Sequence, residues 1–406
     1  MNFSEKVPKL RFPEHTTEYI TKPLAQVFSN TGGTSLEDQV SVSGTHKFIS
    51  IGNYSKDGNY IDNSQRIPLN DKTRAKLLNK GDLVMVLNDK TKTGDIIGSS
   101  ILIESNDAYI YNQRSEKLVL RREEFSSKYC WFLLNTPKQR KDVFKISQGG
   151  TQIYVNFSAV KTLSISFPTL PEQQKIADFL TSIDKRTAQL TEKKALLEDY
   201  KKGVMQQIFS QATRFKDDNG DDFPDWEEKT LGGVGKITTG KTPSTSDDTA
   251  WVGDTMFVTP SDIGEDTKFQ YKTSRHVNGE KLRLIPKGSL MFTCIASVGK
   301  MSIATKPCIT NQQINSVSVG SGFLFEYVYY ALRNLTPRIK ATQANTTLPI
   351  INKTEFSKVA LSFPSLPEQT KIANFLSAID RKLDTVTSQI TETQSFKRGL
   401  LQQMFV

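Results

Sequence analysis

Residues 235–242, GKITTGKT, satisfy the pattern GxxxxGK[ST], in which backbone amides and a lysine cradle nucleotide phosphates. That chemistry needs a buried strand before the loop and a helix that begins at the lysine, so that the helix dipole faces the phosphate. Here an acidic segment precedes the motif, and Pro243 follows within TPSTSDD, a composition typical of a loop. We therefore reject nucleotide hydrolysis, and a basic glycine turn that faces a polyanion fits the residues better.

Other catalytic constellations are absent from the sequence. It contains no (D/N)PP(Y/F) tetrapeptide of amino-methyltransferases, no GxGxxG that opens a strand–helix unit and no HExxH. Glu227 and Glu228 beside Lys229 imitate part of a nuclease triad. The two glutamates end the acidic stretch DDNGDDFPDWEE (217–228), which is expected to be a solvated linker. The sequence thus offers no catalytic residue.

The cysteines and histidines limit the compartment and the cofactors. The chain has three of each, scattered, with neither a CxxC pair nor a histidine cluster. This usage favours a reducing cytoplasm and argues against disulfides or a metal site. No segment is apolar enough to span a membrane, and the first residues lack the apolar core of a signal peptide. A cytoplasmic protein without a metal is therefore expected.

Charge points to a polyanion as the partner. The chain of 406 residues carries a net charge of +10, and residues 1–160 hold 22 basic against 17 acidic side chains. Residues 229–355 hold 15 against 9. A basic balance in both parts suits nucleic acid, while a solubilising surface charge is the simpler alternative.

Polar loops supply the candidate contacts, because amide and hydroxyl groups donate to phosphates and read base edges. Two such loops are QGGTQ (148–152) and QANTT (343–347). Together with basic and amide-rich turns elsewhere, they give the following candidate DNA contacts: Lys90, Lys92, Thr93, Arg114, Gln148, Thr151, Gln152, Lys241, Thr242, Lys300, Asn311, Gln312, Gln343 and Asn345.

A tandem duplication organises the chain and must position these loops. SFPTLPEQQKIADFLTSID (166–184) recurs as SFPSLPEQTKIANFLSAID (362–380), with 14 of 19 positions identical at an offset of 196. The preceding segments match only in fragments, such as Lys80-Gly81 with Lys287-Gly288. Short apolar runs there predict mixed α/β (α+β) domains with many short strands, and a short helix near each domain's end, at 124–136 and 324–334. Two domains of one fold with different surfaces are expected.

Each repeat begins a long helix. Pro171 and Pro367 stand where a helix begins, and a glutamate follows in the first turn, where the helix dipole favours a carboxylate. Apolar residues then recur in steps of three and four over about five heptads, which predicts a coiled-coil seam. The seam residues are Ile176, Leu180, Ile183, Leu190 and Leu197 in the first helix and Ile372, Leu376, Ile379, Leu383, Val386 and Ile390 in the second.

The two seams most simply pair with each other. Polar positions in one often match apolar positions in the other, as with Thr187 and Leu383. The alternative is that each seam packs on its own domain or on another polypeptide. An intramolecular antiparallel pair predicts a pseudo-two-fold protein with a globular domain at each end.

At this point the chain resembles the specificity subunit of type I restriction-modification systems. The resemblance rests on two variable domains, each closed by FPxLPEQxKIAxFLxxID and a long helix, and on GKITTGKTPSTS, which is similar to the opening of a target recognition domain. It implies target recognition domains at 1–160 and 213–355 and conserved regions at 161–212 and 356–406. It also implies that each domain reads half of a split, asymmetric DNA sequence, and that the paired helices act as a ruler.

The resemblance further implies partners. Two modification subunits would bind S-adenosylmethionine and methylate adenine, and two restriction subunits would use ATP and Mg²⁺ as motor and nuclease. The chain itself would be a non-catalytic subunit without a cofactor. The alternatives are a self-contained nuclease or methyltransferase with an unrecognised active site, and an assembly coiled coil.

Overall fold

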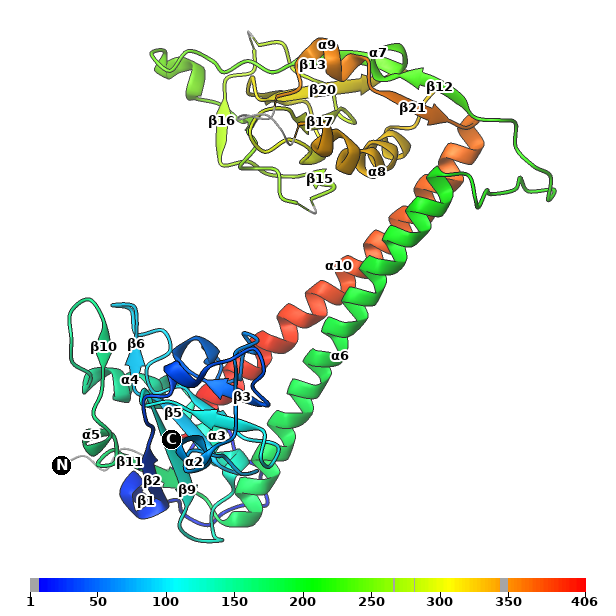
Figure 1. The fold of residues 1–406 in the computed structure, drawn as a ribbon. Helices are drawn as coiled ribbons and strands as arrows, with labels where there is room; N and C mark the ends of the chain where they lie inside the picture. The colour runs from blue at the N-terminus through cyan, green and yellow to red at the C-terminus, as the bar shows by residue number, and fades with distance from the viewer. Residues whose placement is uncertain (1–6, 266, 281, 344–349) are drawn as a thin grey trace. The chain divides into compact units, whose positions relative to one another are not determined.

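The computed structural model describes residues 7–265, 267–280, 282–343 and 350–406. The chain forms two compact units, residues 1–191 with 388–406 (unit 1) and residues 192–387 (unit 2). Two long helices, α6 (Leu170–Phe209) and α10 (Leu366–Gln403), each contribute one part to either unit (Figure 1). The two units are therefore described one at a time.

Unit 1 is built on a four-stranded antiparallel sheet. Its order is β2 (Phe28–Gly32), β9 (Ser115–Leu120), β5 (Leu83–Val86), β7 (Ser100–Leu102). A second sheet shares a buried core with it and has the order β4 (Arg66–Ile67), β3 (His46–Ile49), β8 (Tyr109–Tyr111). Two further strand pairs are β1 (Ile20–Pro23) with β11 (Ser164–Phe167) and β6 (Asn88–Asp89) with β10 (Ile153–Tyr154).

Short helices complete unit 1. They are α1 (Leu24–Val27), α2 (Asp71–Arg74), α3 (Ser127–Leu134), α4 (Pro137–Lys145) and α5 (Phe157–Val160). The helix expected at 124–136 is α3, and its aromatic residues Tyr129 and Phe132 are buried in the core, as predicted. The Thr136 hydroxyl then caps α4, whose first residue is a proline.

Unit 2 repeats this topology. Its main sheet has the order β13 (Gly235–Thr239), β20 (Ile314–Val319), β17 (Leu290–Thr293), β18 (Met301–Ala304), β15 (Phe269–Gln270). The second sheet has the order β16 (Arg275–Val277), β14 (Thr255–Val258), β19 (Ile309–Thr310), and β12 (Glu227–Thr230) pairs with β21 (Ala360–Phe363). The helices besides α6 and α10 are α7 (Leu231–Val234), α8 (Phe325–Gln343) and α9 (Lys353–Ser357). The expectation of one fold used twice is met by the common order of these strands, although β15 has no counterpart in the main sheet of unit 1 and the β6–β10 pair has none among the described strands of unit 2.

Two expectations about unit 2 were wrong. The acidic segment 217–228 is not merely a solvated linker, because its last two residues already belong to β12 and the Trp226 indole donates to Glu368. The helix expected at 324–334 continues to Gln343, since α8 accommodates Pro337 inside it. None of the described helices combines the length and the apolarity that crossing a bilayer requires.

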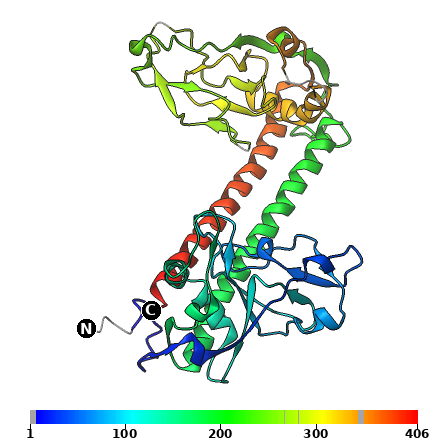
Figure 2. The ribbon, with the colours of Figure 1, turned by 60° about the vertical axis from the view of Figure 1, so that its left-hand side comes forward.

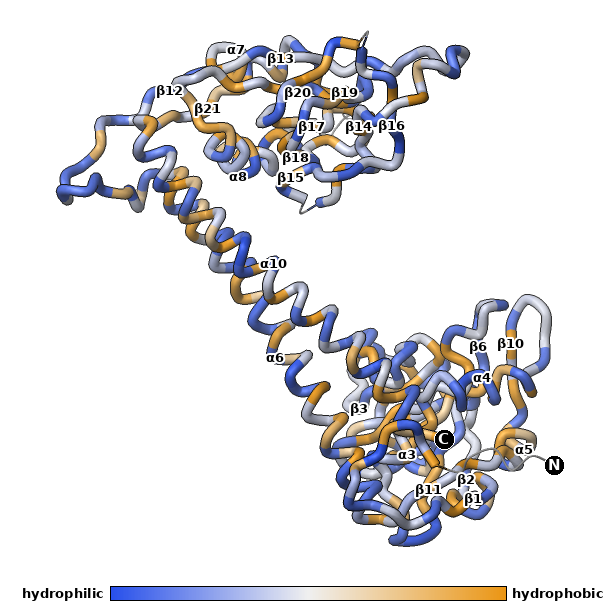
Figure 3. Tube along the Cα trace, turned by 180° about the vertical axis from the view of Figure 1, so that it is seen from behind, coloured by the Kyte–Doolittle hydropathy of each residue, from blue (hydrophilic) through white to orange (hydrophobic). Residues whose placement is uncertain are grey.

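The long helices are amphipathic, and each unit buries its own share of them. In the tube of Figure 3, hydrophilic and hydrophobic residues alternate along α6 and α10. The core of unit 1 contains Ile176, Leu180 and Ile183 of α6 together with Leu400 and Met404 of α10. Apolar burial of this kind stabilises a fold by about 25 cal/mol per Å².

Unit 2 has the corresponding arrangement. Its core contains Met205 and Ile208 of α6 together with Ile372, Leu376 and Ile379 of α10. In each unit, the start of one long helix therefore packs beside the end of the other (Figure 2).

Two matched ion pairs give the direction of this packing. In unit 1, Lys397 contacts the Asp184 carboxylate at 2.5 Å, and in unit 2, Lys201 contacts Asp380 at 2.5 Å. The lysines are 196 residues apart and so are the aspartates, so the pairs are equivalent under the sequence repeat. Each pair joins an early residue of one helix to a late residue of the other, as antiparallel helices require. Of the remaining seam residues, Leu190 and Val386 are buried and Leu197, Leu383 and Ile390 are half-buried.

Candidate nucleic-acid interface

The repeated PEQ sequence anchors each globular domain on its long helix. Glu172 is fully buried, and both of its oxygens accept from the Arg11 guanidinium at 2.7 Å. Gln173 beside it accepts from the Ser126 amide and donates to the carbonyls of Glu124 and Pro168. Sequence reasoning had assigned only a dipole role to the glutamate, because its basic partner lies far away in the sequence.

Unit 2 uses the same device with other partners. Glu368 is fully buried and accepts from the Arg214 guanidinium at 3.3 and 2.9 Å and from the Trp226 indole at 3.2 Å. Gln369 accepts from the Leu324 amide and donates to the Pro364 carbonyl. The repeated PEQ sequence thus anchors the globular domains that carry the candidate interface, and it is not part of that interface.

The glycine turn that resembles a phosphate loop is a packing feature. Residues 235–239 are strand β13, and no described helix begins at Lys241. A Cβ on Gly240 would lie 2.1 Å from the Asn311 carbonyl oxygen, and one on Gly33, at the same place in unit 1, would lie 1.8 Å from that of Asn112. Both glycines are therefore required by a close approach of two backbone segments. The motif GKITTGKT therefore contains strand β13 itself, and no strand–loop–helix unit is formed.

In unit 1 the structure gathers most of the predicted contacts. Lys90, Lys92 and Thr93 are exposed in the loop that follows β6, and Gln148, Thr151 and Gln152 are exposed just before β10. Because β6 pairs with β10, with Ile153 opposite Asp89, these two loops share one edge (Figure 1). Arg114 lies apart from them, half-buried in the turn before β9.

In unit 2 the predicted contacts are more dispersed. Lys241 and Gln312 are exposed, and Thr242 donates its hydroxyl to the Gln312 amide oxygen at 2.6 Å. The Lys300 ammonium is half-buried and lies 3.6 Å from the exposed Glu265 carboxylate. Gln343 is the last residue of α8, and Asn345 falls outside the described residues.

Asn311 requires a correction. It is only 9% exposed, its amide oxygen accepts from the Gln313 backbone, and its amide nitrogen donates to the Gln313 side chain at 2.9 Å. Asn112 takes the same position in unit 1, where its oxygen accepts from the Arg114 backbone. Asparagine is suited to such local turns. Asn311 therefore stabilises the turn, and its prediction as a DNA contact was wrong.

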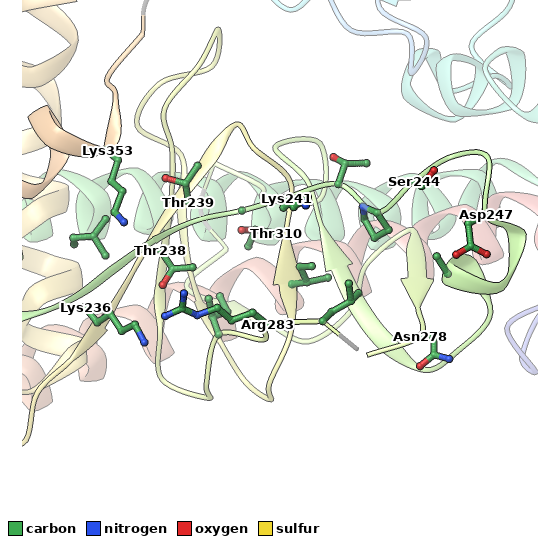
Figure 4. A pocket seen from close by; sticks show the side chains of 18 of the residues that line it. Lys236, Thr238, Thr239, Lys241, Ser244, Asp247, Asn278, Arg283, Thr310 and Lys353 are labelled. Atoms are coloured by element: carbon green, nitrogen blue, oxygen red, sulfur yellow. The ribbon is translucent and has the colours of Figure 1, made fainter. Parts of the chain in front are cut away.

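A cavity in unit 2 brings together residues that no local pattern had connected. It has a volume of about 1040 Å³, and Lys236, Lys241, Arg283 and Lys353 are among its lining residues (Figure 4). These cations come from β13, the turn after it, the segment before Ile285 and α9. Because these residues are far apart in the sequence, no local pattern predicts that they cluster.

Nothing described in the structure resembles a catalytic centre. Burial raises the pKa of the Cys294 thiol to about 11 and that of Cys308 to about 12, which keeps both protonated and unreactive near neutral pH. Within the described ranges, no group of three or more His, Cys, Asp or Glu side chains is placed to hold a metal ion.

Comparisons with known proteins agree with this organisation. The family model described as "Type I restriction modification DNA specificity domain" matches residues 17–199 and 224–393. The "Type I restriction enzyme MjaIX specificity subunit" of Methanocaldococcus jannaschii is 29% identical over 210 residues, 49% of this chain and 48% of that protein, so the match spans about half of the relative. The HindI specificity subunit of Haemophilus influenzae is 24% identical over 71% of this chain and 81% of its own length.

Solved structures show the same fold. The S subunit of a type I restriction-modification system from M. genitalium has a TM-score of 0.62 at 17% identity, and the match covers 98% of this chain and 99% of that one. A structure from a study of assembly and conformational transition of the type I R-M system also gives 0.62 at 17% identity, covering 97% and 98%.

Proposed function

Because the chain belongs to the family of type I restriction-modification DNA specificity domains, we propose that it is the DNA-recognition subunit of such a system. It reads a bipartite, asymmetric target through its two globular domains and carries out no chemistry itself. The observation that carries this proposal is the reuse of one strand order in both units with different loops on it. A shared scaffold with unlike loops suits two readers of two different half-sites.

The partners follow from the same family. Two modification subunits would supply S-adenosylmethionine-dependent adenine methylation, and two restriction subunits would supply ATP- and Mg²⁺-dependent translocation and cleavage, in the cytoplasm where the DNA lies. The basic surface loops of unit 1, Lys90 to Thr93 and Gln148 to Gln152, are the proposed contacts of the first half-site.

The proposal is tested by mapping DNA methylation in a host with and without this chain. We expect one bipartite motif, with a fixed unspecified spacer and one methylated adenine in each half, to be lost when the chain is deleted and regained when it is restored. A deletion strain that keeps every methylated motif contradicts the proposal. Methylation by the purified chain alone would favour a self-contained enzyme instead.

We also propose that α6 and α10 pair as one antiparallel coiled coil that sets the spacing of the half-sites. The matched ion pairs Lys397–Asp184 and Lys201–Asp380 support this reading, since each has the antiparallel direction within its own unit. Each helix is also unbroken at the boundary between the two units, which follows Thr191 in α6 and Thr387 in α10.

Matched insertions test the ruler. Four residues inserted after Thr191 lengthen α6 by about 6 Å and shift its heptad register. Four more after Thr387 should restore the pairing, because both ion pairs lie outside the inserted segments. We expect the doubly inserted protein to methylate the same half-sites across a longer spacer, and a single insertion to methylate poorly. An unchanged spacer in an active double variant would refute the ruler.

A further inference from the structure

We propose that the cavity of unit 2 binds backbone phosphates of the DNA, so that the second domain supplies most of the sequence-independent affinity while unit 1 has no equivalent site. This inference rests on the proposed DNA-recognition function and goes beyond it, because it assigns a phosphate site and an unequal division of labour between the domains.

The charge of the lining is the first argument. Lys236, Lys241, Arg283 and Lys353 line the cavity, and among the described residues none of the four has a carboxylate within ion-pair distance. The lining contains one acid, Asp247, whose carboxylate accepts from the backbone and hydroxyl of Thr249. Uncompensated cations around a cavity attract an anion, and phosphate contacts of this kind supply most non-specific DNA affinity.

The hydroxyl groups of the cavity are the second argument. Thr238, Thr239, Thr242 and Ser244 line it as well. The hydroxyls of Thr239 and Thr242 donate to Asn315 and Gln312, and that of Ser244 shares a hydrogen bond with Ser246, so an anion would compete with these partners. Thr238, Thr239 and Ser244 are labelled in Figure 4. Thr310 also lines it, is 1% exposed, and its hydroxyl oxygen has no hydrogen-bond partner in the structure. Buried hydroxyls normally have a partner, and threonine hydroxyls commonly contact DNA phosphates.

The third argument is what unit 1 has at the same positions. Equivalent strands and fragments place Ser29, Thr34 and Phe157 where unit 2 has Lys236, Lys241 and Lys353. Lys76 corresponds to Arg283, but its ammonium donates to the Gly32 carbonyl at 2.6 Å. At these four positions unit 1 therefore has one cation, Lys76, where unit 2 has four.

Unit 1 also has a bulkier side chain at the position of Thr310. Tyr111 takes the place of Thr310, is fully buried, and donates its hydroxyl to the Thr31 carbonyl at 3.0 Å. Glu116 replaces Asn315, and burial raises the pKa of its carboxyl. A buried aromatic ring in unit 1 thus replaces a small hydroxyl of the cavity lining, and a buried acid replaces the amide that accepts from Thr239 of that lining. Both differences support a phosphate site that is specific to the second domain.

The experiment measures DNA affinity against salt for the chain assembled with its modification subunits. The variant combines Lys241→Gln, Arg283→Gln and Lys353→Gln, and the control combines Lys287→Gln, Lys306→Gln and Lys358→Gln. The control residues are exposed and lie outside the cavity lining, so the net charge falls equally in both proteins. Fluorescence anisotropy is recorded with a target duplex and with an unrelated duplex.

We expect the cavity variant to lose affinity for both duplexes by the same factor, at least about 10-fold at low salt, and its salt slope to flatten by about two to three, since each lost phosphate contact removes about 0.9. The methylated motif should stay the same. The control should change the slope by less than one. A charge-keeping variant, Lys241→Arg with Lys353→Arg, should bind as the unmodified complex does, which separates charge from folding.

Three outcomes overturn the proposal. A cavity variant whose slope matches the control shows that phosphates bind elsewhere, while a specific complex still upholds the proposed function. If the methylated motif of the cavity variant changes, the cavity residues contact bases and not phosphates. The complex without DNA could also bind ATP or inorganic phosphate tightly. If the cavity variant loses that binding but keeps the salt slope of DNA binding, the cavity is a small-molecule site. Absence of DNA binding by the unmodified complex contradicts the proposed function itself.

Discussion

Exchanging residues 1–160 for the first domain of another family member is expected to change one half of the methylated sequence completely and leave the other half unchanged. The reason is that each unit has its own sheets and its own core, and the loops that carry Lys90 to Thr93 and Gln148 to Gln152 belong wholly to unit 1. Side chains that read base edges act locally, so the second half-site keeps its readers. The measurement is sequencing of the methylated motif in a host that carries the chimera.

The chimera needs a matched junction to be informative. The incoming domain must supply a basic partner for Glu172, as Arg11 does here, because that buried carboxylate anchors the domain on α6. A reciprocal exchange of residues 213–355 should alter only the other half-site. Altered bases in both halves of either chimera would contradict independent reading.

Glu368→Ala is expected to destabilise unit 2 by about 2 kcal/mol, because it removes the acceptor of a donor and takes the buried carboxylate away from a half-buried guanidinium. The carboxylate is fully buried, and its loss leaves the Trp226 indole without its acceptor and the Arg214 guanidinium with only the Phe223 and Pro224 carbonyls and the distant, exposed Asp225 carboxylate. This is a large part of the stability of an ordinary domain. Urea unfolding in a Trp131→Phe background measures it, since the two remaining tryptophans, Trp226 and Trp251, both lie in unit 2.

The control is an exposed ion pair in the same unit. Asp218 contacts Lys371 at 2.7 Å but is 95% exposed, so Asp218→Ala should cost less than about 1 kcal/mol. Equal effects of the two substitutions would show that the PEQ carboxylate is not an anchor. Because the chain has two units, only the transition reported by unit 2 is compared.

The sequence predicted the periodic parts of this protein well. Both long helices begin within one residue of the expected proline, and most of the predicted seam residues are buried, whereas Leu197, Leu383 and Ile390 are half-buried. Such features are encoded in residues three and four positions apart, so short-range reading is sufficient. The duplication likewise predicted two domains of one fold, which the common strand order confirms.

Only the tertiary structure decided which polar residues are available to a ligand. Asn311 looked like a contact but is held in a turn, whereas Lys236, Arg283 and Lys353 showed no pattern yet line one cavity. Their segments are joined by sheet pairing and by α9, contacts between residues far apart in the chain. The replacement of Tyr111 by Thr310 opens space in one domain and not in the other. Volume and charge at a site depend on side chains that meet only after folding, and periodicity carries no information about them.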